Sequence, residues 1–213
     1  KPGESRTDLA TRNAAIVREI TTSVMSSGFT GIFLVVTNPV DALTAVVLET
    51  SGLPPERVIG SGTILDSARL RFYIAKYLEI HPKSVHAYRI GEHGDSGFTP
   101  WSCANVGGEN LASSFRPRRR QDFEERVRDA AYQIIEQKGA THYGIGACVV
   151  QIVNYILGDE RRILPVSCYD DFNEIYYGYP AVVGRHGIVR RLDLKLTEEE
   201  GIALQKSINA IKS

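Results

Sequence analysis

One histidine of this chain stands in a setting that suits proton transfer. His93 lies within the segment Arg89–Ser96, which follows an apolar run, with Gly91 two residues before it and Gly94 directly after it. Imidazole titrates closest to neutral pH of all side chains, and nearby glycines let backbone and substrate approach it closely. His93 is therefore a candidate general acid or base. The alternative is a hydrogen-bonded histidine in a turn at the end of a strand.

A carboxylate and two arginines on one predicted helix are the next candidates. Asp66 and Arg69 are three residues apart and share a helix face, so they either face a ligand or form a surface ion pair. Arg71 lies about 200° around the helix from Arg69, which places the two arginines at different pockets. His86 and His93 are seven residues apart in a largely extended segment, and this odd offset predicts opposite faces of a sheet. The pairs His93/Arg69 and His86/Arg71 thus predict two separate sites.

Two further polar residues lie where ligands bind. Arg6 follows the turn residues Pro2 and Gly3, so it is either a mobile cation that moves over a bound anion or a solvated loop residue. Asn38 ends an apolar strand before Pro39, which restricts its backbone. Its amide can both donate and accept hydrogen bonds, which suits a ligand or simply a turn.

Composition excludes several classes of function. The chain has 213 residues, 43% of them hydrophobic, and 25 basic residues balance 25 acidic ones. This balance argues against nucleic acid or an anionic membrane as the main partner. The basic run Arg116–Arg120 is interpreted as a solvated helix start, because Glu124 and Glu125 follow it without an aromatic platform. The acidic run Asp170–Glu174 lacks the spacing of a calcium loop, so no metal site is expected.

Cysteine usage and the ends of the chain complete the bulk picture. The three cysteines match no zinc or disulfide framework, and the apolar run Ile32–Val36 is too short to cross a bilayer. We expect a soluble cytoplasmic protein. Because the chain starts with the turn-like residues Lys1 and Pro2 rather than a methionine, we also expect an N-terminally truncated fragment.

Apolar periodicity alternates between helix and strand in the first third of the chain. It predicts a helix from Leu9 to Val24, a strand over residues 31–36, a helix over 41–49, a strand over 57–60 and a helix over 64–77. Such alternation is typical of a doubly wound parallel sheet, whose ligands bind beyond the carboxyl ends of the strands.

The rest of the chain is typical of an α+β domain. We expect β segments over 85–90 and 101–106, helices over 122–137 and 143–157, an antiparallel meander between residues 163 and 189, and a last helix that a capping box starts at Thr197. The fold class is therefore α/β, with part of a parallel sheet followed by an α+β domain that contains antiparallel strands.

Five motifs together give a resemblance to a known family. They are Lys1–Arg6, Thr37–Asp41, Leu65–Arg69, Gly91–Ser96 and Lys138–Thr141. In this order and near this spacing, the sequence resembles the L-lactate dehydrogenase branch of the lactate/malate dehydrogenase family, of the allosteric bacterial type. The resemblance runs through nearly the whole chain. It implies the second half of a Rossmann-type NAD domain over residues 1–61 and a catalytic domain over 62–213, with the helix at 143–157 packing back on the NAD domain.

The resemblance also implies a reaction and roles for the candidate residues. The reaction is the reversible reduction of pyruvate to L-lactate, with hydride from NADH and a proton from His93. Asp66 would orient the imidazole and stabilise its charged form. Arg69 would hold the substrate carboxylate through two parallel hydrogen bonds, and Arg6 would polarise the carbonyl when its loop closes. Asn38 and Thr141 would contact the substrate, and the cofactor side would be formed by Val36, Thr37, Asn38, Ser61 and Ile145.

A second ligand and an assembly follow from the same resemblance. Arg71 and His86 match the cations that bind fructose 1,6-bisphosphate between subunits of allosteric members, so we expect a homotetramer that this effector activates. The glycine-rich dinucleotide fingerprint and the residue that selects pyruvate over oxaloacetate would precede Lys1, so the chain alone is expected to bind NAD poorly and to be inactive.

Two alternative functions stay open at this point. One is a malate or other L-2-hydroxy acid dehydrogenase of the same family. The other is a non-catalytic remnant that serves as an interaction module.

Overall fold

The structure is a computed structural model that describes residues 6–212, with side chains from Thr11 onward. The motif Lys1–Arg6 and the side chain of Arg6 therefore lie outside the described residues. Within residues 6–212, no helix combines the length and the apolar character needed to cross a membrane.

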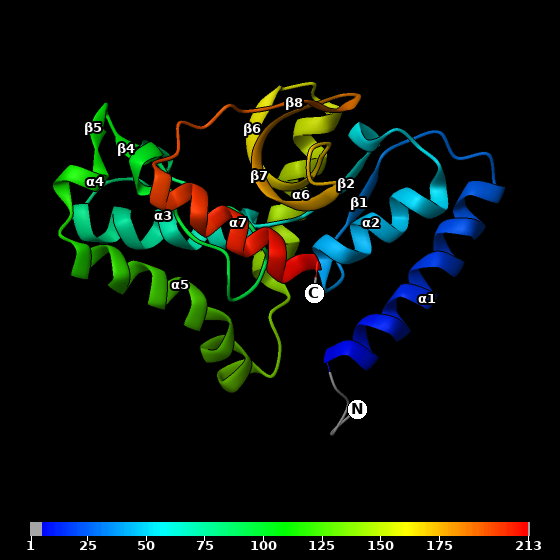
Figure 1. The fold of residues 1–213 in the computed structure, drawn as a ribbon, viewed down its shortest axis with the longest axis horizontal. Coiled ribbons are helices and arrows are strands. Elements are labelled where there is room, and N and C mark those ends of the chain that lie inside the picture. The colour runs from blue at the N-terminus through cyan, green and yellow to red at the C-terminus, as the bar shows by residue number, and fades with distance from the viewer. Residues whose placement is uncertain (1–5, 213) are drawn as a thin grey trace.

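A five-stranded mixed sheet forms the centre of the fold (Figure 1). Its order is β1 (Phe33–Val35), β2 (Val58–Gly60), β6 (Arg162–Asp170), β7 (Ile175–Gly184) and β8 (Gly187–Arg191). β1 and β2 run parallel, and β6, β7 and β8 form the expected antiparallel meander. The expected fold class, a partial parallel sheet followed by antiparallel strands, is confirmed. β2 also pairs antiparallel with β6 through Gly60 and Ser167. One sheet thus contains strands from both sides of the domain boundary expected at residue 61, and that boundary stays a prediction.

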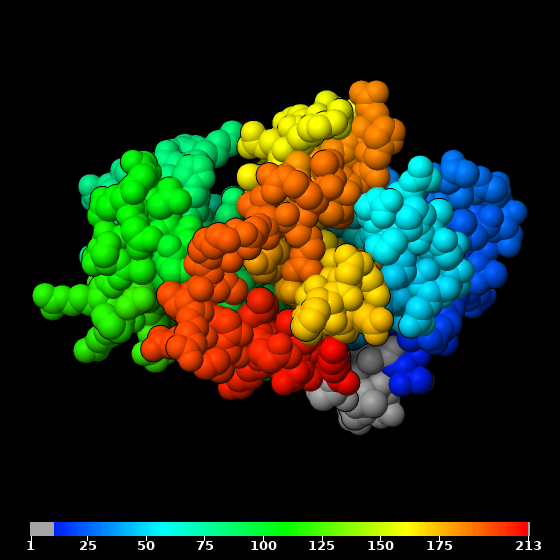
Figure 2. Space-filling model, turned by 45° about the horizontal axis from the view of Figure 1, so that its top comes forward, coloured from blue at the N-terminus to red at the C-terminus, as the bar shows by residue number. Residues whose placement is uncertain are grey.

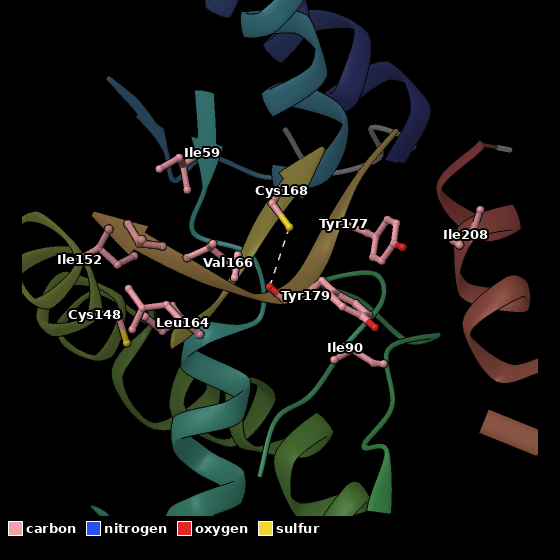
Figure 3. Close-up of a cluster of buried hydrophobic side chains, with 13 residues drawn as sticks. Ile59, Ile90, Cys148, Ile152, Leu164, Val166, Cys168, Tyr177, Tyr179 and Ile208 are labelled. Carbon is pink, nitrogen blue, oxygen red and sulfur yellow. Dashed lines mark hydrogen bonds between the residues drawn. The ribbon is translucent and has the colours of Figure 1, made fainter. Parts of the chain in front are cut away.

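Alternate residues of the strands bury the two faces of this sheet against different helices. Val58 and Tyr176 belong to a core with α2 (Val40–Ser51), beside which lies α1 (Arg6–Ser26). Their neighbours Ile59 and Tyr177 belong to a core with α6 (Tyr143–Leu157), shown in Figure 3. Successive strand residues point to opposite faces, so α2 and α6 cover opposite sides of the sheet.

A second group of elements packs beside the sheet around its own core (Figure 1). Two long helices, α3 (Ile64–Leu78) and α5 (Pro117–Lys138), contact each other there. The short elements of this group are η2 (Pro82–Ser84), η3 (Trp101–Cys103), α4 (Leu111–Ser114) and a small sheet of β3 (Val85–His86), β4 (Asn105–Val106) and β5 (Glu109–Asn110). The remaining short turn, η1 (Pro55–Arg57), contacts β2, β6 and β8 of the central sheet.

Two strand predictions in this region are wrong in part. Trp101 begins the 3-10 turn η3 rather than a strand, and its ring packs beside Phe115 and Phe123. The strand expected over 85–90 ends at His86, and Ile90 instead forms an isolated bridge with Phe98. The chain turns between these two residues, and this turn carries His93.

The last helix, α7 (Glu198–Lys212), begins with the expected capping box. The Thr197 N–H donates to Glu200 Oε2 at 3.0 Å, and the Glu200 N–H donates to Thr197 Oγ1 at 3.3 Å. The helix contacts β7, and Ile208 enters the core shown in Figure 3. Figure 2 shows α7 in red along one edge of the molecule, following the orange segment after β8. This position brings α7 against the loop that carries His93.

Candidate active site

The structure brings His93 and Asp66 into direct contact. The His93 Nδ1 lies 2.7 Å from Asp66 Oδ2, although the two residues are 27 positions apart. The Asp66 side chain is 13% exposed and that of His93 29%. The contact occupies Nδ1, so Nε2 is the ring nitrogen left to exchange a proton with a ligand.

The electrostatics of this pair favour a charged imidazole. Burial by itself would lower the pKa of His93, but the hydrogen bond and the negative charge of Asp66 outweigh it and raise that pKa above 6.5. Burial would raise the pKa of Asp66, yet the contact with His93 and the nearby charges of His93, Arg89 and Arg69 lower it. The pair therefore favours an imidazolium beside a carboxylate near neutral pH.

Arg69 completes a small polar cavity next to the pair. Its Nη1 lies 3.4 Å from Asp66 Oδ1, and its side chain is 14% exposed. Asp66, Arg69 and His93 line a cavity of about 200 Å³, whose opposite wall comes from α5, including Tyr132. A guanidinium beside an imidazole in a cavity of this size can hold a small carboxylate within reach of the imidazole.

A second, larger hollow meets the first at His93. It has a volume of about 480 Å³ and is lined by Asn38, Pro39 and His93, together with Tyr132 and Ala210. The expected substrate contact Asn38 thus lines a hollow that His93 also lines. The Asn38 carbonyl accepts a hydrogen bond of 2.9 Å from the Asn13 amide of α1, which fixes the backbone at this point.

A buried carboxylate that sequence reasoning passed over supports the loop of His93. Asp41 is 5% exposed, and its Oδ2 accepts the His93 N–H at 2.9 Å while its Oδ1 accepts the Ser167 hydroxyl at 2.6 Å. Burial raises its pKa to about 6, against the lowering effect of these two hydrogen bonds. Asp41 is the last residue of the Thr37–Asp41 motif and lies at the start of a helix. This position is the feature of the sequence that could have identified it.

α7 holds the other side of this loop through one serine. The Ser207 hydroxyl accepts the Glu92 N–H at 2.8 Å and lies 3.0 Å from the Ser96 hydroxyl. Gly91 adopts φ +90°, and a Cβ there would collide with Ser207. A glycine is therefore required where the loop turns towards His93. No sequence pattern indicated Ser207, because it is a single hydroxyl on an amphipathic helix.

The residues expected on the cofactor side lie at one edge of the sheet. Val36 and Thr37 follow β1, and Ser61 follows β2. These strands are parallel, so their carboxyl ends meet, and the Ser61 N–H donates to the Val35 carbonyl at 2.8 Å. Ile145 is half-buried on the first turn of α6, against the core that α6 forms with Ile59 and Tyr177. Backbone and small side chains at the carboxyl ends of parallel strands fit the nicotinamide end of a dinucleotide.

Other expected site residues lie apart from His93. Thr141 is half-buried between α5 and α6 and does not line either hollow. Arg71 is half-buried on α3, where Tyr88, Cys148 and Tyr155 surround it, and burial lowers its pKa. His86 is exposed on β3. No hydrogen bond or ion pair joins Arg71 to His86 in the part of the chain that the structure describes.

Comparison with known proteins agrees with this architecture. Residues 1–60 match the family model "lactate/malate dehydrogenase, NAD binding domain", and residues 63–213 match "lactate/malate dehydrogenase, alpha/beta C-terminal domain". The chain belongs to the lactate/malate dehydrogenase family. Its cofactor is NAD.

The relatives include curated L-lactate dehydrogenases. The chain is 49% identical to that of Streptococcus mutans over 100% of its own length and 68% of the relative, and 50% identical to that of Geobacillus thermodenitrificans over 100% and 70%. A lactate dehydrogenase from a Medee basin deep-sea metagenome library superimposes with a TM-score of 0.96 at 44% identity, covering 100% of this chain and 71% of that one. The malate dehydrogenase of Aeropyrum pernix gives 0.93 at 35% identity, with 100% and 70% coverage.

Proposed function

We propose that His93, Asp66 and Arg69 carry the proton-transfer and substrate-holding part of the reaction. The function itself is NAD-dependent L-lactate dehydrogenation, because the chain is about 50% identical to curated L-lactate dehydrogenases over its whole length. The observation that supports the residue roles is the 2.7 Å contact of Asp66 with His93, beside a cavity that Arg69 also lines.

The pair moves one proton per turnover. When NAD is bound in its reduced form, it supplies the hydride that reduces the ketone carbon. His93 in its charged form donates the Nε2 proton to the oxygen that becomes the hydroxyl, and in the reverse direction the neutral ring accepts it. Asp66 keeps the ring oriented and stabilises the imidazolium at each stage.

The neighbouring cations and amides orient the substrate. Arg69 binds the carboxylate of pyruvate or L-lactate through two parallel N–H donors, which sets the keto group towards His93. Asn38 contacts the substrate from the larger hollow. The nicotinamide end is held by Val36, Thr37, Asn38, Ser61 and Ile145. Arg6 closes over the carbonyl, and Thr141 is a further substrate contact although it lines neither hollow. We also propose a division into a nucleotide-binding part over residues 1–61 and a catalytic part over 62–213, which the two family matches support.

The decisive experiment removes the proton donor. We expect His93→Gln, measured on the complete gene product, to lower kcat for pyruvate reduction on the order of 10³-fold while the protein stays folded. His186→Gln, at an exposed histidine of the turn between β7 and β8, is the control and should leave kcat unchanged. Equal activity of His93→Gln and the wild type would refute the assignment of His93. A higher kcat/KM for oxaloacetate than for pyruvate would instead favour the malate alternative.

We further propose that the protein forms a homotetramer which fructose 1,6-bisphosphate activates. Arg71 and His86 lie away from the His93 cavity, on α3 and β3. A second copy placed against this surface would bring two such sets of cations together, and a bisphosphate would relieve their repulsion and favour the assembled state.

A further inference from the structure

A buried arginine next to the active site is not used by the proposed mechanism. Arg89 is 5% exposed and lines the 200 Å³ cavity together with Asp66 and His93. Its Nη1 pairs with Glu124 of α5, whose side chain is 25% exposed, and its Nη2 donates to the Gly97 carbonyl. Two nitrogens of the guanidinium thus have partners, one on helix α5 and one on the loop that carries His93.

The backbone of Arg89 is anchored just as firmly to α3. Its N–H donates to the Ser67 hydroxyl at 2.9 Å, and its carbonyl accepts the Thr63 hydroxyl at 2.6 Å. Ser67 directly follows Asp66 in the chain. Arg89 is therefore fixed beside the carboxylate that contacts His93, with its charge held in a nearly water-free position.

Glu124 joins the same loop from the other side. Besides Arg89, it accepts the Thr99 N–H on Oε1 at 3.1 Å. The loop between the bridged residues Ile90 and Phe98 is thereby held against α5 at its base. α5 also supplies one wall of the cavity, so the Arg89–Glu124 pair fixes that wall relative to His93.

Stability alone is a weak reason to keep such a pair. Removing two charges from water costs roughly as much as their attraction returns, so apolar residues of similar volume often serve the fold equally well. A charge that is nearly excluded from water does, however, act strongly on titrating neighbours, because water screens it little. The pair is therefore placed to act on the potential at the site.

We propose that Arg89 and Glu124 are a positioning pair that sets both the loop geometry and the electrostatic balance of the Asp66–His93 couple. Arg89 places a positive charge beside the couple, and Glu124 offsets it. In agreement, the Arg89 charge is one of the causes that lower the pKa of Asp66, after burial, which raises it, and the contact with His93. This inference rests on the proposed role of His93, but its consequences can be measured without turnover.

Several other charges act on the same imidazole and stay in place in the test. Asp66 and Arg69 face it from α3, Asp41 from α2, Glu92 and Asp95 from its own loop, and Arg128 from α5. The test changes only Arg89 and Glu124, so these groups are the same in every variant, including Asp41, whose own pKa of about 6 makes it titrate close to His93.

The test is an NMR titration of the His93 imidazole in the full chain, which has five histidines. The His93→Gln variant assigns its resonance. We expect Arg89→Leu to raise the measured His93 pKa by about 0.5, because a repelling cation is lost, and Glu124→Gln to lower it by about as much. The double variant Arg89→Leu/Glu124→Leu should return near the wild-type value, and Arg89→Lys, which keeps the charge, should do the same.

A matched control lies on the same helix. Arg126 pairs with Asp122 at the surface of α5, with side chains 56% and 36% exposed, so Arg126→Leu should leave the His93 titration unchanged. If both single variants moved the His93 pKa in the same direction, the pair would act only through the shape of the loop, and the proposal would be overturned. Unchanged titrations would overturn it as well.

Two possible complications are covered by the design. If Arg89→Leu does not fold, Glu124→Gln tests the proposal alone, since it keeps the size of the side chain and changes only its charge. The titration does not depend on turnover. An active His93→Gln enzyme would refute the proposed role of His93, and the titration would still show whether Arg89 and Glu124 set its pKa.

Discussion

Two pairs of candidate residues differ in whether their side chains meet within one molecule. Asp66 and His93 are the more distant pair in sequence, yet their side chains meet at 2.7 Å, largely buried. Arg71 and His86 are closer in sequence, yet no hydrogen bond joins them among the described residues, and His86 is exposed. The first pair is in direct contact within one molecule. The second pair forms no site among the described residues of one molecule, and the proposed effector site would need an added ligand and a second copy.

The largest effect should come from breaking the Asp66–His93 pair. Asp66→Asn keeps the size of the side chain but removes the charge that raises the His93 pKa. We expect kcat for pyruvate reduction to fall on the order of 10³-fold and its alkaline limb to move to lower pH, since the imidazole loses its proton sooner. The pH dependence of kcat measures both. An unchanged alkaline limb would show that Asp66 does not control the imidazole.

Asp41 offers a test of how rigidly the same site is built. Its folded-state pKa of about 6 exceeds the ordinary value of 3.8, so the folded protein binds this proton more tightly than the unfolded one. Its contribution is therefore fully present below pH 3.8 and lost as the pH rises through 6. The full loss is about 3 kcal/mol, of which about 2.4 kcal/mol falls between pH 4 and pH 7. Asp41→Asn should remove this loss, as urea unfolding at pH 4 and pH 7 would reveal.

The control for Asp41 is a carboxylate of the surface. Asp193 has a side chain that is 82% exposed, so Asp193→Asn should leave the difference between the two pH values as in the wild type. A wild-type-like pH dependence in Asp41→Asn would contradict the assignment of this proton to Asp41.

A smaller effect is expected from Arg69→Lys. Lysine keeps the positive charge but cannot form two parallel hydrogen bonds with a carboxylate. The lost charged hydrogen bond is worth about 1.5–3 kcal/mol, so kcat/KM for pyruvate should fall about 10- to 100-fold. Steady-state kinetics with pyruvate measure this change. Arg126→Lys, at an exposed ion pair of α5, is the comparison variant that should show no loss.

The smallest effect on basal activity belongs to the second pair. Arg71→Gln and His86→Gln should leave the activity without effector nearly unchanged, because neither residue lines the His93 cavity. Both should abolish activation by fructose 1,6-bisphosphate at subsaturating pyruvate, and analytical ultracentrifugation should show less tetramer with the effector than for the wild type. A full response to the bisphosphate in both variants would remove the proposed site and leave the His93 site unaffected.

Local patterns of the sequence were enough for the main elements and for the identity of the principal candidates. Apolar periodicity predicted α3 and α6 nearly to the residue, and the Thr197 capping box is formed as expected. The separation of His86 from His93 was also predicted, but on a wrong premise. The chain is not extended between them: it turns after Ile90, so the rule of alternating strand faces does not apply.

What the sequence by itself determined is the set of residues whose roles depend on side-chain type and near neighbours: the imidazole of His93 between glycines, and Asp66 and Arg69 on one helix face. Only the tertiary structure decided which distant groups surround them. Asp41, Ser207 and Glu124 come from three separate segments and meet the His93 loop through hydrogen bonds or charges. Such contacts leave no periodic pattern in a chain, because burial and the path of a loop, rather than local spacing, bring them together.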